Sequence, residues 1–410
     1  MQSDEELQME IKEIVLERMD LTKDIKDEEV LNIIDDVIIE KGKRTFIQVQ
    51  IKNRLRYMVF NAIRRLDLLQ ELIDDKDITE IMVNGPENIF IEKNGKLTKW
   101  DKHFDSKEKY EDIIQQIVSR ANRAVNEANP IVDARLMDGS RVNVVMEPIA
   151  IDGTTLTIRK FPEHPMTVEQ LLLYKSINQE VAHLLEQLVI AKYNIFISGG
   201  TGSGKTTFLN ALSNFIPCDE RIITIEDSAE LQIRNIPNLV RLEVRNSNVE
   251  GKNGISIRDL IKSSLRMRPD RIIVGEVRDG AAIDMLTALN TGHDGSLSTG
   301  HANSPRDMLS RLETLVLLNS EIPLLAVRKQ IASAIDIIVH LGRLRDKSRH
   351  VLEIVEVLDC VDNEIKINPL YEFKEKGVDA EGRIEGELVR TDYRLNNTEK
   401  LSRAGVRIYD

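Results

Sequence analysis

One glycine-rich segment constrains the fold of this chain more than any other feature. It follows an apolar stretch at residues 195–197 and precedes a stretch with helical character. A strand, a glycine loop and a helix in this order predict an α/β fold built on a mostly parallel, doubly wound sheet. The segment satisfies the pattern GxxxxGK[ST] in full. It reads Gly199-Gly200-Thr201-Gly202-Ser203-Gly204-Lys205-Thr206, and Thr207 follows it.

The residue types in this loop suit the binding of a nucleotide. The glycines let successive backbone N–H groups curl around a phosphate, and the start of the following helix adds its dipole. Lys205 supplies positive charge to the phosphate oxygens, and Thr206 offers a hydroxyl to Mg²⁺. We therefore expect ATP and Mg²⁺ as cofactors, with the whole loop as the nucleotide-binding segment. The alternative interpretation is a flexible glycine-rich turn.

Two later strands end in carboxylates, and both acids are candidates for catalysis and for holding the metal ion. The apolar residues 271–274 lead to Gly275 and Glu276. In phosphoryl-transfer sites an acid at such a strand end stands beside Mg²⁺ and the attacking water. We interpret Glu276 as the general base or water-orienting group. Glu226 ends residues 222–225 in the same way, although a solvated strand end before an acidic turn is an alternative.

Two histidines occur in a segment rich in glycine, serine and threonine. The segment spans residues 291–303 and contains His293 and His301. A lone histidine is more often structural than functional. Because the pair accompanies a strand end, we interpret His301 as a candidate sensor of the γ-phosphate.

Three arginines lie upstream of the loop on predicted strands. If Gly139 takes the left-handed position of a three-residue turn over residues 137–139, Arg135 faces Arg141 directly. A two-residue turn would instead split the polar residues between both faces. Opposed like charges are unfavourable unless an anion lies near them. We interpret Arg135 and Arg141, together with Arg159, as a catalytic clamp for phosphate. The alternative is a solvated basic face with acidic neighbours such as Asp133.

Changes of pattern along the chain divide it into five segments. Helical spacing of apolar residues marks the N-terminal part, and strand-like alternation follows it. Two prolines in four residues, Pro162 and Pro165, then stop regular structure. Strand–helix alternation resumes beyond them. The predicted segments are a helical segment at 1–75, an α+β domain at 76–161, a proline hinge at 162–166, an α/β ATPase domain at 167–372 and a polar tail at 373–410.

Composition argues against two classes of function. The net charge is −12 and the aromatic content is 4%. Coating of nucleic acid needs excess Lys and Arg and uses aromatic stacking, so we expect no nucleic-acid partner. No apolar run reaches the length of a membrane span. We expect a cytosolic protein.

The four segments around residues 199–206, 226–230, 271–276 and 292–301, in this order, resemble the secretion-ATPase superfamily. That family drives type II and type IV secretion, pilus extension and retraction, and archaeal motility. It carries a Walker A loop, an acidic box, a Walker B strand that ends in Gly-Glu, and a His box. Two further strings resemble the CpaF-like branch of tight-adherence (Flp) pilus assembly. They are Leu265-Arg266-Met267-Arg268-Pro269-Asp270-Arg271 and Gly275-Glu276-Val277-Arg278-Asp279. The same branch is resembled by Asn290-Thr291-Gly292-His293-Asp294-Gly295 and by Val132-Asp133-Ala134-Arg135.

The resemblance implies a specific architecture and role. It implies an N-terminal α+β domain hinged to a RecA-like domain, with hexameric rings as the working assembly. It implies an ATPase motor that acts on an integral membrane platform protein in pilus assembly or secretion. The motor would be recruited to the inner face of the cell membrane. A RecA-like nucleic-acid translocase and a non-hydrolysing nucleotide switch or scaffold are the alternative functions.

Overall fold

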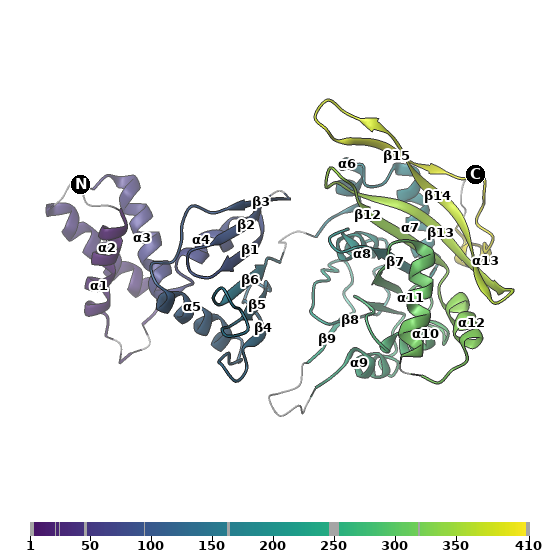
Figure 1. The fold of residues 1–410 in the computed structure, drawn as a ribbon, viewed down its shortest axis with the longest axis horizontal. Helices are drawn as coiled ribbons and strands as arrows, with labels where there is room; N and C mark the ends of the chain where they lie inside the picture. Colours follow the sequence, from purple (N-terminus) through teal and green to yellow (C-terminus); the bar gives the residue numbers. More distant parts are fainter. Residues whose placement is uncertain are drawn as a thin grey trace. The chain divides into compact units, whose positions relative to one another are not determined.

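The computed structural model divides the chain into two compact units, Met1–Glu163 and His164–Asp410 (Figure 1). The structure describes residues 4–20, 22–23, 25–44, 47–93, 95–161, 165–245, 254–318 and 320–406. Residues 162–164 of the expected proline hinge lie outside these ranges. Within the described parts of the chain, none of the helices combines the length and apolar character that a transmembrane helix needs.

The N-terminal unit begins with helices that pack on one another. Their common core contains buried residues such as Ile11, Ile34 and Val59. The helices are α1 (Asp4–Arg18), α2 (Asp27–Arg44) and α3 (Val49–Arg64). The next helix, α4 (Leu68–Asp74), contributes Leu69 and Leu72 to a different core, which lies against the following sheet. The helical segment expected at 1–75 therefore contains two groups of helices with separate cores.

An antiparallel sheet completes the N-terminal unit. Its strands are β1 (Ile78–Asn84), β2 (Ile89–Lys93), β3 (Lys96–Lys99), β4 (Ile131–Arg135), β5 (Arg141–Val145) and β6 (Thr155–Arg159), in the order β3-β2-β1-β6-β5-β4. The helix α5 (Lys107–Arg120) starts at Ser106, whose hydroxyl accepts the Lys109 N–H. Apolar residues of the sheet, such as Val144 and Leu156, are buried with those of α5. Alternation then leaves the polar residues of β5 and β6 on the other face.

The C-terminal unit is built on a larger sheet, with strand order β15-β14-β13-β12-β7-β11-β10-β8-β9. The strands from β12 to β9 in this order are parallel, and β13, β14 and β15 extend the sheet with antiparallel pairing. Their bounds are β7 (Ile195–Gly199), β8 (Ile222–Glu226), β9 (Leu239–Glu243), β10 (Arg271–Val274), β11 (Leu297–His301), β12 (Ile337–Arg343), β13 (Arg349–Val361), β14 (Glu364–Val378) and β15 (Ile384–Arg390). The predicted mostly parallel α/β sheet, preceded by a smaller α+β domain, is confirmed.

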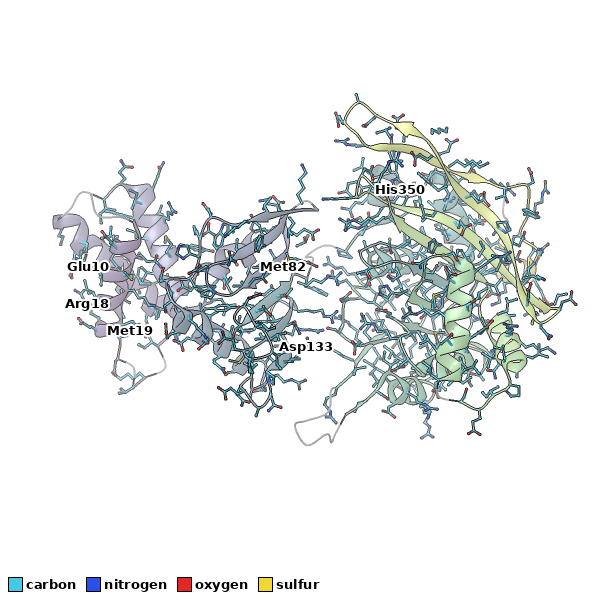
Figure 2. All side chains as sticks on the ribbon, in the orientation of Figure 1. Glu10, Arg18, Met19, Met82, Asp133 and His350 are labelled. Atoms are coloured by element: carbon cyan, nitrogen blue, oxygen red, sulfur yellow. The ribbon has the colours of Figure 1, made fainter. Side chains whose placement is uncertain are left out.

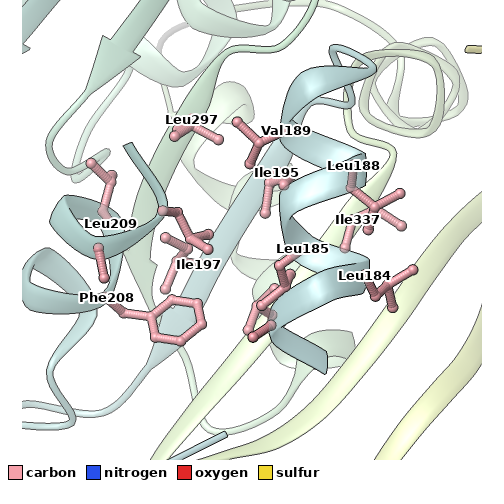
Figure 3. Packing of buried hydrophobic residues seen from close by; sticks show 14 of the residues in the cluster. Leu184, Leu185, Leu188, Val189, Ile195, Ile197, Phe208, Leu209, Leu297 and Ile337 are labelled. Atoms are coloured by element: carbon pink, nitrogen blue, oxygen red, sulfur yellow. The ribbon is translucent and has the colours of Figure 1, made fainter. Parts of the chain in front are cut away.

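Helices cover both faces of this sheet. One core joins the sheet to α6 (Val168–Leu173), α7 (Gln179–Ile190) and α8 (Lys205–Ser213). Figure 3 shows Val189 of α7 beside Ile195 of β7, and Leu188 of α7 beside Ile337 of β12. A second core joins the opposite face to α9 (Ile257–Ser264), α10 (Ala281–Leu289), α11 (Pro305–Leu317) and α12 (Leu324–Ala334). The double covering explains why the central strands are almost continuously apolar.

The structure corrects the prediction of a polar tail at 373–410. Its described part contains the end of β14, all of β15 and the helix α13 (Glu399–Ala404). Leu388 and Leu401 are buried in the core that contains α7. The buried carboxylate of Glu356 also accepts the N–H groups of Asn396 and Asn397. The prediction was wrong because edge strands expose many polar side chains, which leaves a weak apolar pattern in the sequence.

Candidate nucleotide site

The phosphate-loop sequence lies between β7 and α8, where the sheet is closely packed. Strand β7 is buried along its length, and Leu341 of β12 lies opposite Gly199. A Cβ atom at position 199 would come within 2.5 Å of the Leu341 carbonyl oxygen, so this position needs glycine. Gly204, the residue before α8, has a φ of +92°, which is also unfavourable for other residues. The loop backbone is therefore shaped by its glycines.

Lys205 is the first residue of α8, and its side chain folds back along the loop. It is 8% exposed, and its Nζ donates to the carbonyl oxygens of Gly199 at 3.1 Å and Gly200 at 2.9 Å. The same Nζ lies 3.3 Å from Nδ1 of His301. Burial lowers the pKa of Lys205, although the negative charge of Glu276 opposes this. The amine is thus held between the loop and the end of β11.

Glu276 and His301 form the next contacts of the same cluster. His301 Nε2 lies 3.1 Å from Glu276 Oε1, and Arg278 Nη2 donates to Glu276 Oε2 at 2.7 Å. Arg278 Nη1 is also 3.5 Å from Asp227 Oδ2. The contacts run without a break from Lys205 to Asp227. They arise because the carboxyl ends of neighbouring parallel strands meet at one edge of the sheet.

The protonation states follow from these contacts. Burial raises the pKa of Glu276, but the hydrogen bond and charge of Arg278, with His301 and Lys205, outweigh it and leave that pKa lowered. Burial lowers the pKa of His301, and Lys205 lowers it further. A neutral imidazole makes both contacts hydrogen bonds, since Nδ1 accepts from Lys205 and Nε2–H donates to Glu276. Glu276 is then an anion with a fixed orientation.

Glu226 lies at the same edge of the sheet but makes different contacts. Its Oε2 accepts the N–H groups of Glu230 at 2.7 Å and Leu231 at 2.9 Å. Its Oε1 is buried and has no hydrogen-bond partner among the described residues. Burial raises the pKa of Glu226 to about 7. A Cβ at Gly275 would be 2.9 Å from Glu226 Cγ, which places this side chain against the segment that leads to Glu276.

The three arginines of the N-terminal unit share one row of the antiparallel sheet. Arg135 pairs with Arg141 across β4 and β5, and Arg141 pairs with Arg159 across β5 and β6. The turn between β4 and β5 has Gly139 at a φ of +91°, as the three-residue turn requires. Asp133, which is labelled in Figure 2, accepts a hydrogen bond of 3.0 Å from Asn143. The row thus exists in the register that the sequence predicts.

Sequence reasoning missed Arg278 as a member of the nucleotide site, and it missed the charge of Arg311 near that site. Arg278 holds Glu276 directly, and Arg311 of α11 contributes to the lowered pKa values of Lys205 and His301. The role of Arg278 could have been predicted from the sequence, because residues 276 and 278 stand two positions apart just after the same apolar strand. Arg311 lies inside a helix that has no local signal of function.

The described residues fit a magnesium–nucleotide complex better than a metal site made by protein alone. They contain no group of three or more His, Cys, Asp or Glu side chains placed to hold a metal ion. Mg²⁺ usually keeps several waters and binds one or two carboxylates together with substrate phosphates. Thr206 follows Lys205 at the start of α8, and Glu226 presents a buried oxygen without a partner at the same edge. These oxygen groups suit such a shared site.

Comparison with known proteins agrees with this architecture. Residues 63–388 match the family model described as type II/IV secretion system protein. The conjugal transfer protein TrbB of Rhizobium radiobacter is 33% identical over 295 residues, which cover 71% of this chain and 87% of TrbB. The type IV secretion system protein VirB11 of Brucella suis is 32% identical over 321 residues, which cover 70% of this chain and 88% of VirB11. The solved structure of the Yersinia pseudotuberculosis ATPase DotB has a TM-score of 0.53 at 18% identity and covers 71% and 78% of the two chains, a likeness of fold alone.

Proposed function

The chain belongs to the type II/IV secretion system protein family, and on this premise we propose that it is a Mg²⁺-dependent ATPase that powers pilus assembly or protein secretion. One observation carries the proposal. Lys205, His301 and Glu276 form a hydrogen-bonded series beside a complete phosphate-loop sequence. This arrangement supplies a positive charge for phosphate, a neutral imidazole and an oriented carboxylate within one small region.

The loop and its two flanking elements would bind the nucleotide. Backbone N–H groups from residue 199 onward and the side chain of Lys205 would hold the phosphates, with Thr206 and Thr207 at the start of α8. Mg²⁺ would be held by Thr206, with Glu276 and Glu226 as the nearby acids. When bound, the ion neutralises charge on the phosphates.

Glu276 has the properties that a general base needs. It is anionic, its orientation is set by Arg278 and His301, and its side chain retains 18% exposure, which leaves access for water. We assign it the role of orienting and deprotonating the attacking water. His301 contacts both Lys205 and Glu276, so a change at the phosphates bound by Lys205 reaches the base through one imidazole. This position supports its role as sensor of the γ-phosphate.

The arginine row is the second part of the proposal. Guanidinium groups stabilise the negative charge that develops on a transferred phosphoryl group. The paired register of Arg135, Arg141 and Arg159 supports a common anionic ligand, because it places three guanidinium groups in one row. Glu80 stands next in that row, with its carboxylate 3.8 Å from Arg159. We propose that Arg141 and Arg159 act on the γ-phosphate, with Arg135 as a weaker contributor.

The assembly and the partners complete the proposed function. The relatives are named as conjugal transfer and type IV secretion system proteins, which supports a role in a secretion or pilus machine. We propose a homo-oligomeric ring, most simply a hexamer, at the cytoplasmic face of the membrane. It would act on an integral membrane platform protein. The strings at residues 265–271 and 275–279 support the CpaF-like branch of Flp pilus assembly.

The experiment that tests this function is steady-state ATP hydrolysis by the purified protein with and without Mg²⁺. We expect turnover that stops when EDTA removes the metal and that falls below detection in Lys205→Ala. Lys366→Ala is the matched control, because Lys366 is an exposed lysine of β14 in the same unit. Undiminished turnover in Lys205→Ala would exclude the assignment of the phosphate loop.

A further inference from the structure

An arginine outside the motifs makes direct contact with the phosphate loop. Arg349, the first residue of β13, donates from Nε to the carbonyl oxygen of Gly202 at 2.8 Å. Its Cδ also lies 3.4 Å from where a Cβ at Gly204 would be, so its aliphatic part packs along the loop. The guanidinium therefore holds a residue in the middle of the loop from a strand that lies 147 positions further along the chain.

The contact fixes the peptide group between Gly202 and Ser203 in the phosphate loop. A trans peptide is planar, and its C=O and N–H groups point in opposite directions. Holding the Gly202 carbonyl thus also fixes the direction of the Ser203 N–H, which donates to the Gly200 carbonyl at 3.4 Å within the loop. A hydrogen bond from a charged donor is stronger than one between neutral groups. Arg349 is placed to limit the conformations of a loop whose glycines would otherwise permit many.

The backbone of Arg349 is itself tied to the segment between α6 and α7. The hydroxyl of Ser176 donates to the Arg349 carbonyl oxygen at 2.8 Å, and the Val351 N–H donates to the Ser176 carbonyl at 3.1 Å. His350, labelled in Figure 2, lies between Arg349 and Val351 in the chain and is buried. Helix α6 is the first helix after residues 162–166, which connect the two units. The Ser176 N–H donates to the Leu171 carbonyl of α6 at 2.9 Å, so contacts lead from α6 through Ser176 and Arg349 to the loop.

We propose that Arg349 is a positioning residue that sets the shape of the phosphate loop and links it to the α6–α7 segment. The proposal rests on the nucleotide-binding function proposed above. Its consequence is that the affinity of the loop for nucleotide depends on how the α6–α7 segment is held. A displacement of α6 would then reach the loop through one side chain.

The hairpin formed by β12 and β13 supplies its own control. Arg343 of β12 lies directly opposite Arg349 and carries the same charge. Its Nη1 is 3.7 Å from where a Cβ at Gly202 would be, so it lies near the same residue. Within the described residues, no hydrogen bond joins Arg343 to the loop. The two arginines therefore separate the effect of a specific contact from the effect of nearby positive charge.

The test compares Arg349→Ala with Arg343→Ala in the full chain, by KM for ATP, kcat, and titration with a fluorescent ADP analogue. We expect Arg349→Ala to raise KM and the ADP dissociation constant about tenfold with kcat nearly unchanged. The reason is that the loop binds the nucleotide equally in the ground state and in the transition state. Arg349→Lys, which keeps the charge and a donor, should recover part of the loss. Ser176→Ala should give a smaller loss in the same direction. Arg343→Ala should remain within about twofold of the wild type.

Two results would overturn the inference. Wild-type ADP affinity in Arg349→Ala would show that the Gly202 contact does not shape the loop. Equal losses in Arg349→Ala and Arg343→Ala would show that general positive charge is responsible. An unfolding midpoint that is unchanged without nucleotide shows that a variant is folded. If Arg349→Ala is not folded, the ADP affinity of Arg349→Lys is compared with that of Arg343→Ala instead. A wild type that binds the ADP analogue but does not turn over ATP would contradict the proposed function alone, since the ADP titrations still decide the role of Arg349.

Discussion

The two sheets of this protein gather charged side chains in opposite ways. On the antiparallel sheet, register alone places Arg135, Arg141 and Arg159 in one row, with Glu80 next to Arg159 at its end. At the edge of the parallel sheet, residues from distant parts of the chain meet, and their charges alternate from Lys205 through Glu276 and Arg278 to Asp227, with the neutral His301 between Lys205 and Glu276. An alternating cluster is favourable by itself, whereas a row of like charges gains most when an anion binds. The proposed role of the row therefore needs a bound anion, whereas the contacts of the cluster are made without a ligand.

The largest expected effect concerns the arginine row. Where arginines act on the transferred phosphoryl group they are worth about 10³ to 10⁵ in rate. We therefore expect Arg141→Ala and Arg159→Ala to lose most turnover while ADP affinity stays within a few-fold. Arg135→Ala should lose less. ATPase rates measured beside ADP titrations check this prediction.

Lys96→Ala provides a control for the arginine variants, because Lys96 is an exposed cation on β3 of the same sheet. Normal turnover in both Arg141→Ala and Arg159→Ala would identify the row as a solvated basic face. The contrast between the two sheets would then be one of surface charge and not of function.

The second effect concerns the carboxylate of the alternating cluster. Glu276→Gln keeps the shape of the side chain and can still accept a hydrogen bond from Arg278, but it cannot take a proton. General acid–base groups contribute roughly 10² to 10⁴ in rate. We expect turnover to fall by that range while a non-hydrolysable ATP analogue still binds. Glu387→Gln on β15, an exposed acid of the same unit, is the control.

Loss of analogue binding in Glu276→Gln would give the residue a different role. It would mean that the carboxylate mainly holds Lys205 and His301 in place, or holds the metal ion. The cluster would then be a structural support for the loop, and the base would have to be sought elsewhere.

The sequence predicted features that depend on local pattern. The strands that lead to Gly199 and Glu276 were predictable because buried parallel strands are short apolar runs that end in polar residues. The facing of Arg135 and Arg141 was predictable because a short hairpin fixes register over a few residues. In both regions the chain itself carries the spacing that brings the side chains together.

Features that depend on distant packing could not be predicted in this way. The contact of Arg349 with Gly202 exists because β12 lies beside β7 and β13 beside β12, an order of strands that no local pattern specifies. The burial of Glu226 likewise depends on Gly275, in a neighbouring strand segment. The assignment of 373–410 as a tail failed for the same reason, because the apolar residues of β15 find their partners in α7 and β14.

The smallest effect concerns a buried histidine in the parallel sheet that is not part of the alternating cluster. His340 of β12 lies opposite Ser198, and its Nδ1 is 2.9 Å from the Ser198 hydroxyl. Burial lowers the pKa of His340, although the Asn303 carbonyl and Asp307 oppose this. In the unfolded chain His340 binds a proton below its ordinary pKa of about 6.5, whereas in the folded protein it binds that proton only at lower pH. Stability from this group is present above pH 6.5 and is lost as the pH falls toward the lowered folded pKa.

His340→Asn should therefore make the thermal stability of the C-terminal unit less sensitive to pH between 7.5 and 5.5. Asparagine offers a polar group near the position of Nδ1 but does not titrate, so the variant should lose some stability at pH 7.5 and converge on the wild type at pH 5.5. A change of 1 kcal/mol moves the midpoint of a domain of this size by roughly 2–4 °C, which calorimetry resolves. The remaining dependence is expected from His301 and His350, whose pKa values burial also lowers, and in the opposite direction from Glu226, whose pKa burial raises to about 7. His183→Asn, at a half-exposed histidine, should keep the wild-type dependence. If His340→Asn and the wild type lose stability in parallel as the pH falls, the interior of the sheet is not the source of the acid sensitivity, and the charged groups at its edge must be.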